Sequence, residues 1–147
     1  MVIKFRVDVD TNVSPEKIMA AFTDFTDRRL KLWPGLSKNL YKVHSVGKTS
    51  ADVTEGSDKP IVVWAREVYD WSTPNVIRWS VKKSNFSLPG HTMKVTVTPK
   101  GKESHVTLLY DRGVYGVKGI LAGMMMKVIG KAIITKYYRD TFNSWIQ

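Results

Sequence analysis

Between about Leu40 and Arg112 the chain places apolar residues at every second position, in short runs separated by turn residues. A period of two is that of a β-strand with one face in a core and the other in water. Turn sequences such as Val46-Gly47-Lys48 and Leu88-Pro89-Gly90 stand between the runs. The stretch therefore predicts an antiparallel meander of about six strands, which restricts the chain to folds built on such a sheet.

The apolar set of each run predicts which side chains point into the core. Between Ile61 and Trp71 both alternate sets are partly apolar and each contains a charged residue, and we favour the set with Val63, Ala65 and Tyr69. The other predicted inward positions are Tyr41, Val43, Ala51, Val53, Ile77, Trp79, Val81, Met93, Val95, Val97, Val106, Leu108 and Tyr110.

The residues before the meander predict one more strand and two short helices. Residues 2–9 alternate between apolar and polar and read as a half-buried strand. Ser14 is suited to cap a helix that begins at Pro15, and we expect this helix to end near Thr26. A second short helix is expected from Arg28 to Leu32, since the Trp33-Pro34-Gly35 sequence that follows favours a stop.

The last 30 or so residues change period and predict one long amphipathic helix from about Lys118 to Trp145. Its glycines lower the intrinsic helix propensity, so tertiary packing is expected to hold it, inside the grip of the sheet. We expect residues 1–147 to form a single domain. The arc expected to face the sheet consists of Leu121, Met124, Met125, Val128, Ala132 and Ile133.

Composition limits the environment and the partners. The chain has no cysteine, which excludes disulfides and thiolate chemistry, and no apolar stretch long enough for a signal-peptide core or a membrane span. We therefore expect a soluble cytoplasmic protein. The net charge of +10 is concentrated in residues 28–51, 71–102 and 112–139, which contain no carboxylate. Such a field favours an anionic partner, either an acidic small molecule, a membrane surface or nucleic acid, or else it only keeps the protein soluble.

Three segments resemble a known family. They are the helix opening Val13-Ser14-Pro15-Glu16-Lys17, the strand Trp64-Ala65-Arg66-Glu67 and the turn Asp70-Trp71-Ser72-Thr73-Pro74-Asn75. With the order of elements they resemble the START-like superfamily, the polyketide cyclase/dehydrase and lipid transport group of helix-grip proteins. The resemblance covers essentially the whole chain and implies an α+β fold in which a curved antiparallel sheet of six or seven strands wraps the C-terminal helix. It carries over no catalytic signature.

In such an architecture the sheet and the long helix would enclose an apolar cavity for a hydrophobic or amphipathic ligand. The alternative is that the same methionine and aromatic side chains are plain core. The expected cavity wall consists of Tyr41, Val63, Tyr69, Trp79, Met93, Val95, Leu108, Tyr110, Leu121, Met124, Met125 and Val128.

Three ionisable residues, Glu67, His91 and Arg112, share the parity of apolar strand neighbours, so that inward projection is open to each of them. Glu67 and Arg112 are compatible with a simple buried ion pair, and His91 with a half-exposed position at a strand start. If the cavity is catalytic, Glu67 or His91 would be the acid or base of an aldol-type cyclisation or dehydration, with Tyr110 or Arg112 polarising a carbonyl.

No metal or cofactor is expected. The three histidines, His44, His91 and His105, stand on separate predicted strands without a partner at ligand spacing, and no phosphate-loop pattern occurs.

Three functions remain open from the sequence: a binder or carrier of a hydrophobic, possibly anionic, small molecule; a cyclase or dehydratase; and a basic interaction module for RNA, a ribosome or a membrane surface. The binder is preferred. Nucleic acid is disfavoured because no exposed aromatic stacking motif accompanies the charge. The oligomeric state is left open.

Overall fold

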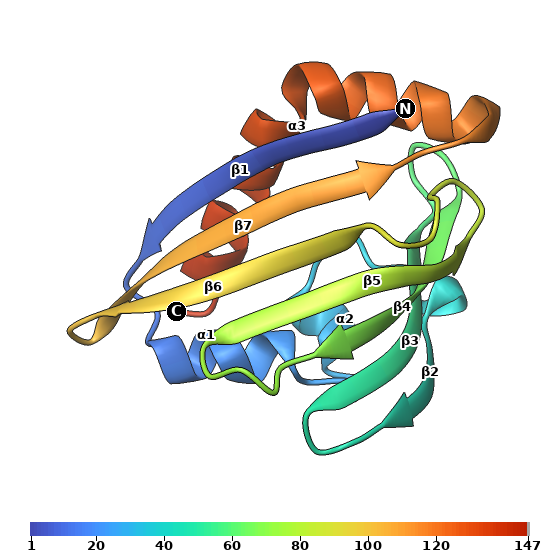
Figure 1. Cartoon of the computed structure of the whole chain (residues 1–147). Helices are drawn as coiled ribbons and strands as arrows, with labels where there is room; N and C mark the ends of the chain where they lie inside the picture. The colour runs from blue at the N-terminus through green and yellow to red at the C-terminus, as the bar shows by residue number, and fades with distance from the viewer. Residues whose placement is uncertain (147) are drawn as a thin grey trace.

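Seven antiparallel strands form one curved sheet in the order β1-β7-β6-β5-β4-β3-β2 (Figure 1). The structure, a computed structural model, describes residues 1–146. The sequence correctly predicted the helix-grip class, with a sheet of six or seven strands, two short helices after the first strand and a long C-terminal helix. The strands are β1 (Val2–Thr11), β2 (Lys42–Val46), β3 (Ser50–Ser57), β4 (Val63–Asp70), β5 (Val76–Ser84), β6 (Thr92–Lys100) and β7 (Glu103–Gly113).

The period of two sets the inner face of the sheet. In β4 the predicted set is the inner one: Ala65 and Tyr69 are 3% and 5% exposed and Val63 is half-buried, whereas Val68 is 42% exposed. Tyr41, which directly precedes the edge strand β2, and Val43, which lies on it, are only half-buried. Every other inward position predicted on β3, β5, β6 and β7 is buried.

Two short helices, α1 (Pro15–Phe22) and α2 (Arg29–Leu32), follow β1. The Ser14 hydroxyl accepts a hydrogen bond from the backbone N–H of Lys17 at 3.2 Å, which is the predicted cap. The prediction that α1 continues to Thr26 was wrong. Asp24 accepts from the backbone N–H of Thr26 at 2.9 Å, and this local turn competes with further helix.

The long helix α3 (Gly116–Ser144) forms as predicted, but its first half presents a different face to the sheet. Gly119, Gly123 and Gly130 are the buried positions there, and β1 is the strand against which α3 packs. A Cβ on Gly123 would lie 2.7 Å from a methyl of Val114, so a larger residue would push the helix away. Glycine lets backbone and sheet approach closely where alanine or leucine would not.

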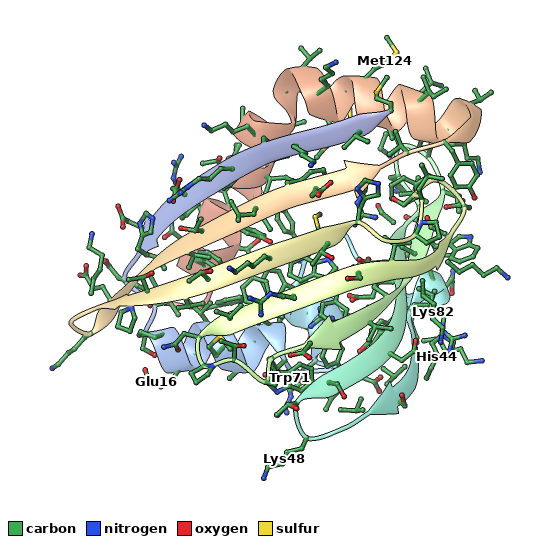
Figure 2. The ribbon with its side chains drawn as sticks, in the orientation of Figure 1. Glu16, His44, Lys48, Trp71, Lys82 and Met124 are labelled. Carbon is green, nitrogen blue, oxygen red and sulfur yellow. The ribbon has the colours of Figure 1, made fainter. Side chains whose placement is uncertain are left out.

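The predicted inward arc of α3 therefore points mostly to solvent. Val128 is 82% exposed, Leu121 60% and Met124 53%, and Figure 2 shows Met124 pointing away from the sheet. Periodicity correctly predicted an amphipathic helix, but the identity of the sheet-facing side was wrong, because close packing selected the smallest residues over the most apolar ones.

The second half of α3 is anchored by aromatic packing behind the sheet, near α1 (Figure 1). Phe142 is fully buried and Tyr138 nearly so. The rings of Phe22 and Trp33 lie 4.6 Å apart, centroid to centroid, and both pack within about 6 Å of Tyr138. This cluster joins α1, the loop after α2 and α3 into one hydrophobic core with the sheet.

None of the helices described within residues 1–146 is long and apolar enough to cross a membrane.

Candidate ligand-binding cavity

Three neighbouring cavities lie on the inner face of the sheet. The inner cavity, about 140 Å³, lies among Arg29, Glu55, Tyr69 and the aromatic cluster. The middle cavity, about 240 Å³, shares Glu55 and Tyr69 with it. The outer cavity, about 450 Å³, shares Val63, Phe86 and Arg112 with the middle one. Together they offer mostly apolar walls interrupted by two charged pairs.

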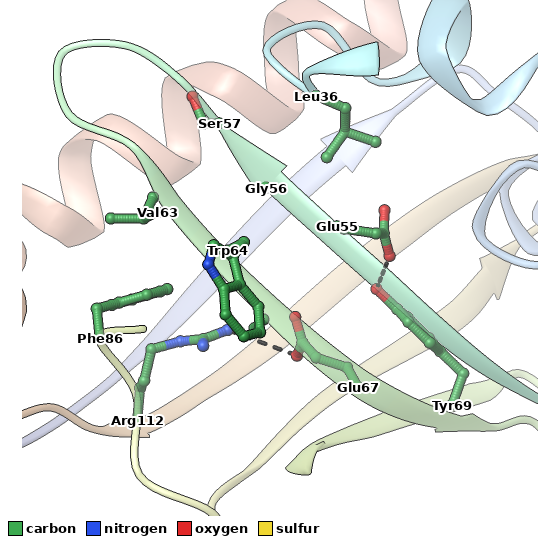
Figure 3. A pocket seen from close by; sticks show the side chains of 11 residues that line it. Leu36, Glu55, Gly56, Ser57, Val63, Trp64, Glu67, Tyr69, Phe86 and Arg112 are labelled. Carbon is green, nitrogen blue, oxygen red and sulfur yellow. Dashed lines mark hydrogen bonds and ion pairs between the residues drawn. The ribbon is translucent and has the colours of Figure 1, made fainter. Parts of the chain in front are cut away.

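The first pair, Glu67 on β4 and Arg112 on β7, lies on the wall of the middle cavity (Figure 3). Arg112 Nη2 is 3.6 Å from Glu67 Oε2, an ion pair but too long for a hydrogen bond. Arg112 Nη1 instead donates to the Ser87 hydroxyl at 2.7 Å, and its guanidinium carbon stands 5.3 Å from the centroid of the Phe86 ring. Glu67 Oε2 is buried and has no hydrogen-bond partner.

Burial dominates the protonation of Glu67. Removal from water raises the pKa of this carboxyl to about 7; the charge of Arg112 opposes the rise and that of Glu55 adds to it. At neutral pH the group therefore exists in both protonation states. Glu67 Oε2, which has no hydrogen-bond partner, can accept a hydrogen bond when the group is ionised and donate one when it carries the proton.

The second pair, Arg29 and Glu55, lies where the inner and middle cavities meet. Arg29 Nε is 2.9 Å from Glu55 Oε2, and its Nη1 donates to the backbone carbonyls of Phe22 and Asp24. The Tyr69 hydroxyl donates to Glu55 Oε1 at 2.5 Å. Both charges are thus met by hydrogen bonds from within the protein.

The same contacts shift the pKa values of Arg29 and Tyr69. Burial by itself lowers the pKa of Arg29, but the charge of Glu55 and the oxygen of Tyr69 outweigh it, and the pKa lies above its usual value. Burial, helped by the charge of Glu55, raises the pKa of Tyr69 well above its usual value. Arg29 stays a cation and Tyr69 a neutral hydroxyl.

A bulge on β5 lies opposite Glu67, which the regular alternation of β4 places on the inner face. Between β4 and β5, Arg66 pairs with Lys83 but Glu67 pairs with Val81, so Lys82 is one residue extra. The bulge exposes Lys82 and Lys83 in succession while keeping Val81 and Ser84 buried.

The predicted cavity residues fall into three groups. Val63, Tyr69, Trp79, Tyr110, Leu121 and Met125 line the three cavities. Met93, Val95 and Leu108 are buried in the core and are not among the lining residues. Tyr41 is half-buried and its hydroxyl donates to the Thr26 carbonyl at 3.4 Å, while Met124 and Val128 stand on the outer side of α3.

Among the catalytic candidates, the structure brings Glu67, Tyr110 and Arg112 together and leaves His91 out. The Tyr110 ring stacks on Phe5 at 4.4 Å and lines the outer cavity, and burial raises the pKa of its hydroxyl. His91 takes the half-exposed position at a strand start, with a satisfied ring, that the sequence favoured over inward projection. It precedes β6, its Nδ1 lies 2.8 Å from Asp111 Oδ1, and its ring rests against Gly113.

The sequence reasoning missed Glu55, Arg29 and Phe86 as lining residues. Glu55 shares the parity of Ala51 and Val53 in β3, so the signal for its burial was present. Arg29 and Phe86 lie outside strands, where no period indicates their direction.

Within residues 1–146 no three histidine, cysteine or carboxylate side chains come together as metal ligands would. The expectation that the protein needs no metal or cofactor therefore stays a prediction.

The curved antiparallel sheet gripping a long C-terminal helix, with cavities between them, defines a START-like protein. The chain belongs to the family described as polyketide cyclase/dehydrase and lipid transport, whose model matches residues 2–143.

Solved structures with the same fold include two enzymes and a protein named only by its superfamily. The Zhui aromatase/cyclase from Streptomyces sp. R1128 matches with a TM-score of 0.77 at 9% identity, over 98% of this chain and 93% of that one. A START superfamily protein from Mycobacterium smegmatis gives 0.67 at 12% identity, over 92% and 97%. Norcoclaurine synthase from Thalictrum flavum, in complex with dopamine and hydroxybenzaldehyde, gives 0.68 at 9%, over 99% and 87%. No curated protein matches the sequence. At such identities the likeness shows the fold alone.

Proposed function

We propose that the protein binds an amphipathic small molecule, with its apolar body in the outer and middle cavities and a hydroxyl group at the Glu67–Arg112 pair. The observation that carries the proposal is Glu67, which lines an apolar-walled cavity and whose buried Oε2 has no hydrogen-bond partner. A buried polar atom left unpaired costs about 1–3 kcal/mol, which a ligand donor would recover.

A hydroxyl suits this pair better than a carboxylate does. Arg112 already has Glu67 as its counterion at 3.6 Å. A ligand carboxylate would face a second carboxylate unless Glu67 were protonated, and like charges at such a distance in a dry site are unfavourable. A hydroxyl can donate to Glu67 Oε2 and accept from Arg112 at once. The anionic ligand considered from the sequence is therefore the alternative that the test addresses.

The test begins with native mass spectrometry of the protein purified from its own host, with extraction to identify any bound molecule. A set of matched ligands then follows, with one apolar skeleton carrying a hydroxyl, a methyl ether or a carboxylate. We expect the hydroxyl compound to bind at least tenfold more tightly than the ether, because only it donates. Empty protein with no affinity for any member would refute the proposal.

A matched pair of variants locates the ligand. Val63→Trp would fill the shared wall of the outer and middle cavities, whereas Val68→Trp adds the same ring on the exposed face of the same strand. We expect the first to abolish binding and the second to leave it unchanged. Equal effects would mean that the ligand does not occupy the cavities.

A second candidate function, cyclisation or dehydration, is favoured by one specific observation. The pKa of Glu67, raised by burial to about 7, suits a general acid or base at neutral pH, with Tyr110 and Arg112 beside it. Incubation with a poly-β-ketone chain distinguishes the two functions. Turnover that Glu67→Gln reduces about a hundredfold or more, with binding retained, would establish the enzyme.

A further inference from the structure

The first half of α3 is built with its apolar side outward. Val117, Leu121, Met124 and Val128 recur at intervals of four, three and four residues and lie opposite the glycines that contact the sheet. Their exposures are 78%, 60%, 53% and 82%. We call these four residues the α3 apolar face. In a water-exposed helix this is the side where polar residues belong, so the face is expected to be covered by a partner.

Cations flank the α3 apolar face and carboxylates do not. Lys118 lies toward one side of the helix and Lys127 and Lys131 toward the other, all exposed. Residues 112–139 contain no Asp or Glu. An apolar stripe between lysines is the pattern of a helix that lies in the interface of an anionic membrane, apolar side among the acyl chains and lysines at the head groups.

The α3 apolar face also adjoins the mouth of the outer cavity. Leu121 belongs to both, and Lys59 and Pro60, which are exposed like Leu121, line the same cavity. A bilayer on the face would thus lie at the cavity entrance.

We propose that the α3 apolar face docks on the surface of an anionic lipid bilayer. A second copy of this chain fits the face less well, because a symmetric contact brings Lys127 and Lys131 of both copies together without a carboxylate on the segment to neutralise them. Lipid phosphate supplies that charge. The proposal goes beyond ligand binding and does not depend on it, because the face stands outside the cavity walls except at Leu121.

The experiment is co-sedimentation of the full chain with vesicles of phosphatidylcholine alone or of phosphatidylcholine and phosphatidylglycerol in equal parts. We expect binding to the mixed vesicles that salt weakens, and little binding to the neutral ones. Val117→Gln combined with Val128→Gln should reduce binding about tenfold, because the apolar contact is lost while the charge is kept. The control, Val46→Gln with Val68→Gln, changes two exposed valines elsewhere on the sheet and should bind as wild type.

A second pair separates local charge from overall charge. Lys127→Gln with Lys131→Gln should weaken binding to the mixed vesicles, whereas Lys48→Gln with Lys102→Gln, exposed lysines in two distant hairpin turns, should change it much less. Both variants of a pair behaving alike would overturn the proposal, as would wild-type protein that fails to sediment at low salt. A wild-type dimer that Val117→Gln with Val128→Gln converts to a monomer in ultracentrifugation would also overturn it and assign the face to self-association.

Discussion

Arg29–Glu55 and Glu67–Arg112 are both buried ion pairs on the inner face of one sheet, but they differ in how far their hydrogen-bonding groups are satisfied. Arg29 and Glu55 contact at 2.9 Å and are surrounded by Tyr69 and two backbone carbonyls. Glu67 and Arg112 stand 3.6 Å apart, with one carboxylate oxygen unsatisfied. A pair whose hydrogen bonds are all met holds the fold, whereas a pair that lacks one has capacity left for a ligand.

Position reinforces the contrast. Arg29 ties α2 to β3 and lines the inner cavity, while Arg112 lies on the wall that the middle and outer cavities share. Variants of each pair therefore separate the requirement for folding from the requirement for binding.

The largest effect is expected when Arg29 is replaced. Arg29→Met leaves Glu55 as a buried charge without its counterion, and this should lower the free energy of unfolding by about 3–5 kcal/mol. Urea denaturation followed by circular dichroism measures it. A loss below about 1 kcal/mol would mean that the closed pair does not hold the fold.

The next largest effect is a pH-dependent change in the free energy of unfolding, caused by the titration of Glu67. Burial raises its pKa from 4.5 to about 7, so between these values the folded state holds a proton that the unfolded state has released. The stability contributed by this group is present below pH 4.5 and is lost as the pH rises to 7, in total roughly 3 kcal/mol. Glu67→Gln removes the titration and should be near neutral at pH 5 but more stable than wild type at pH 8.

Urea unfolding of both proteins at the two pH values measures that difference, and the other titrating groups cancel in it. Glu55→Gln is the matched control, because it removes the counterion of Arg29 and should destabilise at both pH values. A Glu67→Gln variant less stable than wild type at pH 8 would indicate that Glu67 and Arg112 form a closed pair after all.

A smaller loss of stability is expected when Ser87, whose hydroxyl accepts a hydrogen bond from Arg112, is replaced. Ser87→Ala removes the acceptor 2.7 Å from Arg112 Nη1 and should cost about 1–2 kcal/mol and weaken ligand binding. Ser80→Ala, which breaks a half-buried hydroxyl contact with Thr92, is the control for stability and should leave binding unchanged. Calorimetric titration and urea unfolding provide the two readouts, and loss of binding in both variants would argue against a specific role for Ser87.

The smallest effect is expected for a half-buried pair on the other face of the sheet. Arg66 contacts Asp52 at 2.8 Å, but water screens it, so Arg66→Met should leave the unfolding midpoint almost unchanged. A shift as large as that of Arg29→Met would contradict the view that burial distinguishes these pairs.

Much of the sheet was predictable because the side of a strand that is buried follows from the local alternation of apolar and polar residues. Ala51, Ile77 and Val95 alternate with polar residues, and an alternating strand has only one side it can bury. The same rule indicated that Glu67 and Arg112 share the inner face. The buried ion pair expected of them is confirmed, but its long 3.6 Å separation was not predictable, because β4 and β7 are separated by two strands in the sheet and the distance between their side chains depends on its curvature.

The helix α3 was predictable only in part. Its length and amphipathic character follow from the order of residues, but which side packs does not, because that depends on how near the neighbouring strand comes. A Cβ on Gly119 would lie only 2.6 Å from the carbonyl oxygen of Phe86 in the loop after β5, and one on Gly123 would lie 3.1 Å from Ile3 Cδ1 on β1. Close packing therefore requires glycine on this side, and the apolar residues turn outward.

The sequence by itself determined the strands, their inner faces, the Ser14 cap of α1 and the family, since these depend on local periodicity, backbone preferences and short motifs. Tertiary structure alone decided which buried charges are satisfied, where the cavities lie and which side of α3 is exposed. Hydrogen-bond satisfaction and close packing are properties of side chains brought together from distant parts of the chain. A local sequence pattern does not determine the distances between such side chains.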